Sequence, residues 1–172
     1  MVAVGALIAA IVLMIKLTPK RHIYFYTDES KTDLLLQVLH DQTVALITAT
    51  YTLLSPEGEL LARIRKNYLY NLFRKRWDVF GPQGETIVIA REDSLILSLL
   101  RRFLGTFFGI LRTNYILLTP GRDGEERLRG EFNRKFTLFD RYVLDLTRDR
   151  PPTIDRRAAV ALGVLLDTGE HR

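Results

Sequence analysis

The sequence contains no cysteine. This absence excludes a disulfide framework, a thiol nucleophile, cysteine-ligated zinc and an iron–sulfur cluster. Histidine is also scarce, since His22, His40 and His171 are the only three and show no metal-ligand spacing. No acidic loop of the EF-hand type is present. The residues therefore predict neither a metal ion nor a cofactor.

Motifs of the common enzyme classes are missing as well. The chain has no G-x-x-x-x-G-K-[ST] loop, no G-x-G-x-x-G loop and no G-x-S-x-G motif. Adjacent acids such as Asp28 and Glu29, or Glu92 and Asp93, are typical of turns and helix caps. Because nothing combines a nucleophile, a base and an orienting group, we predict that the protein is not an enzyme.

What is present is the composition of a folded domain. The chain has 172 residues, of which 47% are hydrophobic and 26% charged, and this rules out a disordered chain. Its length fits a single domain over residues 1–172. Twenty-five Lys and Arg residues against 20 Asp and Glu give a net charge of +5. That mild excess is compatible with an anionic partner without identifying one.

The first segment is apolar. Residues 2–15 carry no charge, but the run is shorter than the roughly 20 residues of a membrane-spanning helix. It also lacks the basic start of a secretory signal. Because it is rich in β-branched residues, we predict an early strand over residues 1–17. The alternative is a membrane anchor.

Short apolar runs bounded by turn signals follow along the chain. SPEGE (55–59), GPQGE (81–85) and GRDGEE (121–126) are the clearest turns. Because strands do not alternate regularly with helices, the pattern favours an antiparallel sandwich or barrel over a doubly wound sheet. The predicted strands are 21–26, 43–54, 60–66, 76–80, 86–92, 113–120, 126–136 and 139–147.

The last predicted element is a helix over residues 153–168, with Thr153 or Asp155 near its N-cap. Its segment AAVALGVLL (158–166) is apolar on every face, and at about 14 Å it is too short to cross a bilayer. The simplest environment for such a helix is the inside of a closed sheet. We therefore predict a β-barrel that encloses this helix. The alternative is a core helix that lies on one face of a sheet.

The chain resembles a known group of proteins. The run GEFNRKFTLFDRYVLDLTRD (130–149), followed by TIDRRAAVALGVLLD (153–167), is similar to the end of the LURP-one-related and phospholipid scramblase families, which are tubby C-terminal-like. HIYFYTDES (22–30) and the stretch from Ala49 to Glu85 fit the same pattern. The resemblance covers about residues 5–167 and implies a twelve-stranded barrel around a central helix over residues 154–167.

The resemblance implies contact with lipid rather than catalysis. Scramblases are associated with calcium, palmitoylated cysteine and lipid movement, whereas tubby-like domains are associated with phosphoinositides. Without a cysteine, palmitoylation is excluded in this chain. No headgroup-binding residue of these families can be matched here, so only anionic lipid in general is carried over.

Two sets of residues are candidates for a binding role. The first is a basic cluster without an acid, interleaved with the aromatic residues Tyr68, Tyr70, Phe73 and Trp77, which suits an anionic membrane surface or nucleic acid. The alternative is a solvated strand face. The basic cluster consists of Arg63, Arg65, Lys66, Arg74, Lys75 and Arg76.

The second is a predicted amphipathic helix over residues 93–112, whose apolar side covers an arc of roughly 220°. Such a helix suits a lipid headgroup layer, a partner subunit or burial within its own domain. Its predicted membrane or partner contacts are Leu99, Leu100, Phe103, Phe107, Phe108 and Leu111.

Together these observations predict a non-enzymatic module that contacts anionic phospholipid, a protein partner or a second copy of itself. We expect it in the cytoplasm, peripheral to a membrane. The alternative is a nucleic-acid-binding module that uses the basic cluster between Arg63 and Arg76.

Overall fold

The computed structural model describes residues 20, 22–41, 48–68, 75–93, 114–121, 123–135 and 141–168. Within these ranges the fold is mainly β, with nine strands in one antiparallel sheet whose spatial order follows the chain. The strands are β1 (Ile23–Tyr26), β2 (Leu34–His40), β3 (Thr48–Leu54), β4 (Leu60–Asn67), β5 (Arg76–Phe80), β6 (Thr86–Glu92), β7 (Tyr115–Pro120), β8 (Glu126–Lys135) and β9 (Arg141–Asp145), and helix α3 (Arg156–Thr168) follows them.

Three hairpin turns share one construction. In each, a backbone amide of a glycine donates to the carbonyl three residues earlier, as from Gly58 to Ser55 at 3.0 Å. The glycines of these turns have φ values of 88°, 86° and 81°, a region that side-chain-bearing residues rarely adopt. The strand register shifts by one residue beside each turn. The predicted turns at 55–59, 81–85 and 121–126 are thereby confirmed, and they hold Gly58, Gly84 and Gly124.

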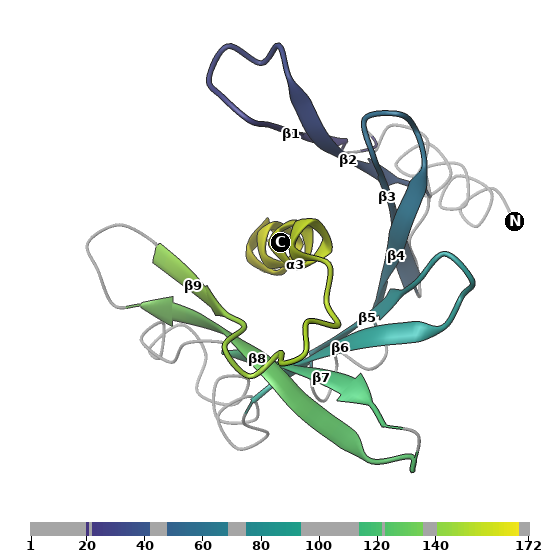
Figure 1. The fold of residues 1–172 in the computed structure, drawn as a ribbon, viewed down its shortest axis with the longest axis vertical. Helices are drawn as coiled ribbons and strands as arrows, with labels where there is room; N and C mark the ends of the chain where they lie inside the picture. The colour runs from purple at the N-terminus through teal and green to yellow at the C-terminus, as the bar shows by residue number, and fades with distance from the viewer. Residues whose placement is uncertain are drawn as a thin grey trace, which may run out of the picture.

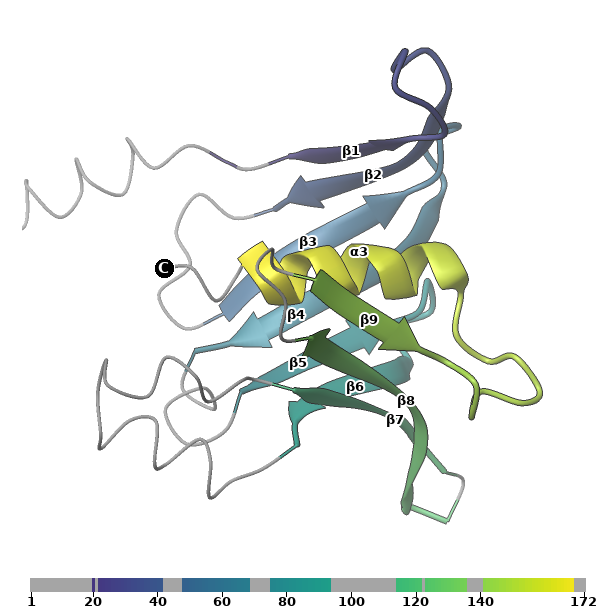
Figure 2. The ribbon, with the colours of Figure 1, turned by 90° about the vertical axis from the view of Figure 1, so that its left-hand side faces the viewer.

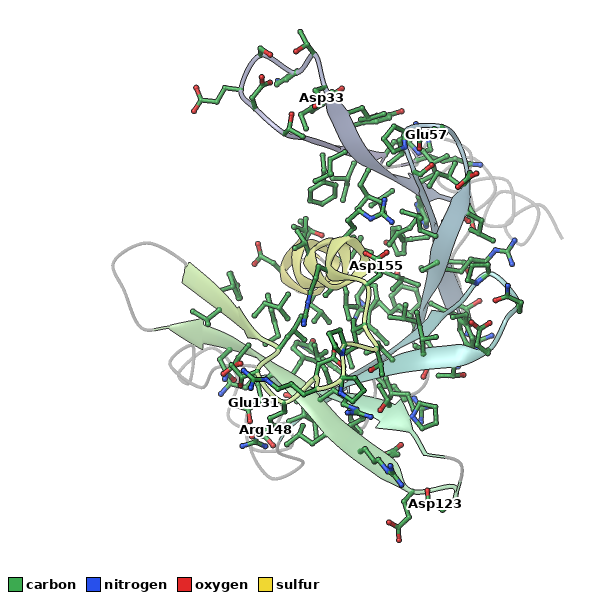
Figure 3. The ribbon with its side chains drawn as sticks, viewed as in Figure 1. Asp33, Glu57, Asp123, Glu131, Arg148 and Asp155 are labelled. Atoms are coloured by element: carbon green, nitrogen blue, oxygen red, sulfur yellow. The ribbon has the colours of Figure 1, made fainter. Side chains whose placement is uncertain are left out.

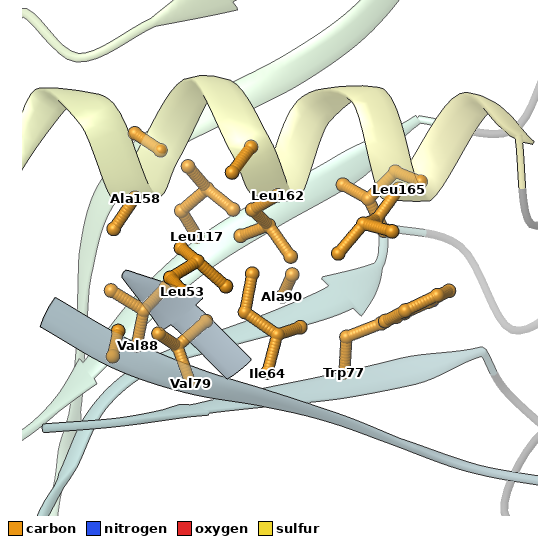
Figure 4. Packing of buried hydrophobic residues seen from close by; sticks show 14 of the residues in the cluster. Leu53, Ile64, Trp77, Val79, Val88, Ala90, Leu117, Ala158, Leu162 and Leu165 are labelled. Atoms are coloured by element: carbon orange, nitrogen blue, oxygen red, sulfur yellow. The ribbon is translucent and has the colours of Figure 1, made fainter. Parts of the chain in front are cut away.

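The sheet curves around α3, which lies on its concave side (Figures 1 and 2). Ala158, Leu162 and Leu165 face the buried residues of β4 to β7, as Figure 4 shows. Leu162 is only 2% exposed. On the side of β8, Gly163 lets the helix approach the sheet, because a Cβ added there would already lie 3.0 Å from Phe132 Cε2. The prediction of a mainly β fold with a packed C-terminal helix is confirmed.

The sheet is not closed among the described residues. β1 and β9 form its two edges and do not pair with each other. As a result α3 is not buried on every side, and Val160 is 48% exposed. The predicted complete enclosure of α3 is therefore wrong for this part of the chain. The physical reason is that the described sheet ends at β1 and β9, and no described strand covers the helix between these two edges.

Several predicted elements fall outside the described residues. These are the early strand or anchor over residues 1–17, the amphipathic helix over residues 93–112 apart from Asp93, and the first part of the strand predicted over residues 43–54. β2 is an element for which no strand was predicted. The helix predicted over residues 153–168 begins at Arg156.

Two aspartates fix the start of α3. Asp155 is its N-cap, since its Oδ1 accepts from the backbone N of Arg157 at 2.8 Å. Asp149 is 1% exposed and accepts hydrogen bonds from the Thr153 hydroxyl at 2.6 Å and from the Ile154 backbone N at 3.1 Å. Burial raises the pKa of Asp149, but the hydrogen bonds from Thr153 and Ile154 outweigh it, and the net pKa is lowered. The carboxylate thus stays ionised and holds the loop that leads into the helix.

Candidate functional site

The outer face of β4 presents two arginines to solvent. β4 alternates strictly in its middle, so that Ala62 and Ile64 are completely buried while Arg63 and Arg65 are exposed. Successive side chains of a strand point to opposite faces, which places both arginines on the convex side of the sheet. Within the described ranges, neither has a carboxylate within ion-pair distance. Their charges are therefore available to an anionic partner.

Neighbouring strands hold these side chains in place. Arg65 pairs in register with Thr50 of β3 and Asp78 of β5. Its guanidinium lies 4.6 Å from the centre of the Phe80 ring, a cation–π contact worth about 0.5–1 kcal/mol at an exposed site. The contact restricts Arg65 without neutralising it. An arginine in this arrangement keeps its hydrogen-bond donors free for phosphate or carboxylate.

Arg76 lies on the same outer face but is already paired. Its Nε donates to Asp78 Oδ1 at 2.8 Å, and Asp78 is 7% exposed. Arg76 is also the direct cross-strand neighbour of Arg91, which forms its own ion pair with Glu126 at 2.8 Å. The outer face of β4 to β6 thus carries four arginines. Among the described residues of this face, Arg63 and Arg65 are the arginines whose charge no carboxylate offsets.

Lys66 belongs to the other face of the sheet. It pairs in register with Ala49 and Trp77, both of which are buried on the concave side. Its ammonium lies 5.0 Å from the ring centres of both Tyr68 and Trp77. The structure therefore separates Lys66 from Arg63 and Arg65, although all three are close in sequence.

The remaining candidates of the basic cluster contribute less. The backbone N of Lys75 donates to Glu92 Oε2 at 3.4 Å, at the start of β5. Arg74 lies outside the described residues. The same is true of all the predicted contacts of the amphipathic helix, namely Leu99, Leu100, Phe103, Phe107, Phe108 and Leu111.

Acidic residues gather at one end of the sheet. The four turns that join β1 to β2, β3 to β4, β5 to β6 and β7 to β8 lie at the end where α3 begins, and Figure 3 labels Asp33, Glu57 and Asp123 there. By sequence these turns hold two cations, Lys31 and Arg122, against eight acids. The acids are Asp28, Glu29, Asp33, Glu57, Glu59, Glu85, Asp123 and Glu125.

Hydrogen bonds keep acids of these turns charged. The pKa of Glu57 is lowered, chiefly by the hydrogen bond that its carboxylate accepts from the Ser55 hydroxyl at 2.7 Å. The pKa of Asp123 is lowered by hydrogen bonds from the Glu125 backbone and the Arg127 guanidinium. Negative charge at this end also suits the positive end of the α3 dipole. The turns are thus negatively charged, although Arg148, Arg150, Arg156 and Arg157 lie at the same end of the sheet.

Sequence reasoning missed a pocket beside α3. It has a volume of about 230 Å³ and lies between the helix and the last two strands. Strand patterns carry no signal for it, because it exists only where the sheet leaves one side of the helix uncovered. Its lining residues are Phe132, Tyr142, Leu144, Val160, Gly163, Val164 and Asp167.

The described residues show neither a metal site nor a membrane-spanning helix. Across the described ranges, no three His, Cys, Asp or Glu side chains come together as a metal site would require. In this part of the chain, α3 is much shorter than a membrane span and no other helix qualifies as one. Compared with known proteins, the chain matches no family model, no curated protein and no solved structure.

Proposed function

We propose that this protein is a non-enzymatic module that contacts anionic phospholipid through the outer face of β4, at the cytoplasmic surface of a membrane. The observation that carries the proposal is the exposed pair Arg63 and Arg65. Both project from a rigid sheet, and in the described structure neither is matched by an acid. Each such residue near an anionic leaflet contributes about 1 kcal/mol of binding free energy.

Exposed apolar side chains on the same outer face support a lipid surface as the partner. Tyr24 is 49% exposed and Leu35 is 41% exposed. Both alternate with buried or half-buried inward residues, so they share the convex side with the arginines. Aromatic and aliphatic groups beside cations suit the boundary between headgroups and acyl chains.

The distribution of charge gives the proposal an orientation. The acid-rich turns lie at one end of the sheet, and their carboxylates disfavour an approach of an anionic leaflet through the turns themselves. The convex face of β4 can approach the leaflet while the turns point away. The resemblance to LURP-one-related and scramblase proteins agrees with a lipid-contacting role. The finer fold prediction, a tubby-like barrel, belongs to the same proposal. The described sheet is open, but it curves around α3, which supports it as part of such a barrel.

Vesicle sedimentation tests the proposal. We expect the wild-type protein to sediment with phosphatidylglycerol vesicles and not with phosphatidylcholine vesicles. Reversing two charges in Arg63→Glu/Arg65→Glu should weaken binding by about 30-fold or more, because at least about 2 kcal/mol of attraction is removed. A matched control is Arg127→Glu/Arg148→Glu, which makes the same change of net charge at side chains that are 60% and 59% exposed.

The control separates a local site from general charge. If both double variants lose binding equally, overall charge is responsible and the β4 site is refuted. If wild-type protein ignores anionic vesicles but is retained by duplex DNA in a salt-dependent manner, the nucleic-acid alternative replaces the proposal.

A further inference from the structure

The lining of the pocket beside α3, called the slot below, follows one face of the helix. Its helix wall consists of Val160, Gly163, Val164 and Asp167, which recur at the i, i+3, i+4 and i+7 positions of one helix face. This stripe spans seven residues, or about 10 Å along the helix. The opposite wall comes from β8 and β9. The slot is thus long in the direction of the helix axis.

The walls of the slot are apolar. The rings of Phe132 and Tyr142 stack with their centres 5.1 Å apart and their planes 8° from parallel, which makes a flat wall. Gly163 keeps the space in front of the Phe132 ring open, because a Cβ at position 163 would lie only 3.0 Å from Cε2 of that ring. Asp167 is the one charged residue of the lining, at the C-terminal end of the stripe. A carboxylate there disfavours a second anion at that end.

A cation stands at the other end of the slot. Arg156 precedes Val160 by four residues, so it lies on the same helix face about one turn, or roughly 6 Å, closer to the N-terminus. Its side chain is 53% exposed, and its Nη1 lies 3.8 Å from Asp149 Oδ2, a loose ion pair. Val160, beside it, is 48% exposed and forms the mouth. The slot therefore runs from Arg156 and the exposed Val160 at one end, along apolar walls, to Asp167 at the other.

We propose that this slot binds a linear alkyl chain with an anionic headgroup, the alkyl chain along α3 and the headgroup at Arg156. The chemistry is that of a fatty acid or of a monoacyl phosphate. An apolar cavity of about 150 Å³ binds benzene, so a volume of about 230 Å³ accommodates a longer hydrocarbon. The slot lies on the concave side of the sheet, whereas Arg63 and Arg65 lie on the convex side. The inference is thus independent of the proposed function.

Calorimetric titration of the full chain with octanoate and butanoate tests the alkyl part. Each buried methylene group strengthens binding about fourfold, so octanoate should bind about 200-fold more tightly than butanoate if all four additional groups enter the slot. Octyl phosphate in place of octanoate distinguishes a phosphate headgroup from a carboxylate. Affinity that does not depend on chain length would overturn the proposal.

Two variants locate the site. Val160→Trp places a large ring in the mouth and should weaken octanoate binding at least tenfold. Val143→Trp is the matched control, because Val143 is 37% exposed and points to the opposite face of β9 from Tyr142 and Leu144, so the same substitution there should leave octanoate binding unchanged. Arg156→Gln should weaken octanoate several-fold and leave the neutral probe octyl glucoside unaffected. Equal losses in Val160→Trp and Val143→Trp refute the location.

A segment of the chain itself competes with the alkyl chain as the occupant of the slot, and a further variant detects it. By composition, the apolar residues 2–15 of this chain are the alternative occupant. Since the chain has no cysteine, Ile11→Cys/Val160→Cys reports such contact through a disulfide without background. If wild-type protein binds no octanoate and this variant forms the disulfide, the chain itself fills the slot and the alkyl proposal is wrong.

Discussion

Replacing Asp149 by asparagine should destabilise the fold in a pH-dependent manner. The carboxylate is 1% exposed and accepts from the Thr153 backbone N at 3.0 Å, the Thr153 hydroxyl at 2.6 Å and the Ile154 backbone N at 3.1 Å. The amide nitrogen of asparagine cannot accept, so at least one of these donors loses its partner. A hydrogen bond to a buried charged group contributes about 1.5–3 kcal/mol.

We therefore expect Asp149→Asn to lower the free energy of unfolding by about 2 kcal/mol at pH 7. Such a loss corresponds to a fall in Tm of about 4–8 °C for a domain of this size. Asp149→Ala removes all acceptors at once and should cost about 3–5 kcal/mol. Urea unfolding and thermal melting followed by circular dichroism measure both values.

The sign of the pH dependence follows from the lowered pKa of Asp149. A carboxyl whose pKa is lower in the folded than in the unfolded state stabilises the fold fully above the unfolded value of about 4, and this contribution is lost as the pH falls through the folded value. The difference between wild type and Asp149→Asn should therefore shrink below about pH 4. Other carboxyls titrate in both proteins and cancel in the difference. A difference that is absent at pH 7, or unchanged in acid, refutes the assignment.

Asp145 provides a chemically matched control for this variant. It also accepts a backbone hydrogen bond, from the Thr147 N at 2.8 Å, but it is exposed. Water can replace its interaction, so Asp145→Asn should change the unfolding free energy much less than Asp149→Asn. Equal effects of the two substitutions would show that burial of Asp149 is not the cause.

Two further predictions concern α3. Asp155→Ala removes the N-cap and should cost about 1 kcal/mol, seen as a fall in Tm of about 2–4 °C, and a Tm equal to the wild type would show that the cap does not matter. Leu162→Ala should cost about 2–5 kcal/mol in urea unfolding, because Leu162 is 2% exposed, whereas Val160→Ala at a 48% exposed position should cost less than about 1 kcal/mol. If Val160→Ala lowered the free energy of unfolding more than Leu162→Ala, the helix would pack against the sheet through its other face.

Local signals in the sequence predict the three glycine turns and every described strand except β2. The three turns at 55–59, 81–85 and 121–125 end in Gly-Glu, and each glycine takes the left-handed conformation that this residue type permits. Short connections of this kind force neighbouring strands to pair. The order of the strands in the sheet therefore follows the order in the chain.

The alternation of side chains along a strand also predicts which basic residues share a face, whereas a list of neighbouring charges does not. Arg63 and Arg65 are two residues apart and share a face, whereas Lys66 follows Arg65 directly and must point to the other side. The pairing of Arg76 with Asp78 has the same two-residue spacing and could be read from the sequence. The contact of Arg65 with Phe80 could not, since it depends on the register between β4 and β5.

The exposed side of α3, in contrast, is not predicted by local signals in the sequence. The segment from Ala158 to Leu166 is apolar throughout, so its composition gives no indication that one face remains uncovered. Whether one face of α3 remains uncovered depends on how far the sheet curves around it. This curvature accumulates over all pairs of neighbouring strands. The pocket beside Phe132 and Tyr142 depends on the same curvature. Neither could be predicted from any local stretch of sequence.

Alternation across the sheet makes the two proposed binding sites separable. Inward residues of β4, such as Ala62 and Ile64, pack in the core beneath α3, whereas the arginines between them contact none of it. Charge reversal at Arg63 and Arg65 can therefore abolish vesicle binding without disturbing the helix or its slot. A substitution at Val160 acts on the concave side and leaves the convex face intact. If Arg63→Glu/Arg65→Glu changed the affinity for octanoate, or if Val160→Trp changed vesicle binding, the two faces would be coupled through the sheet. In that case neither site could be assigned from its own face alone.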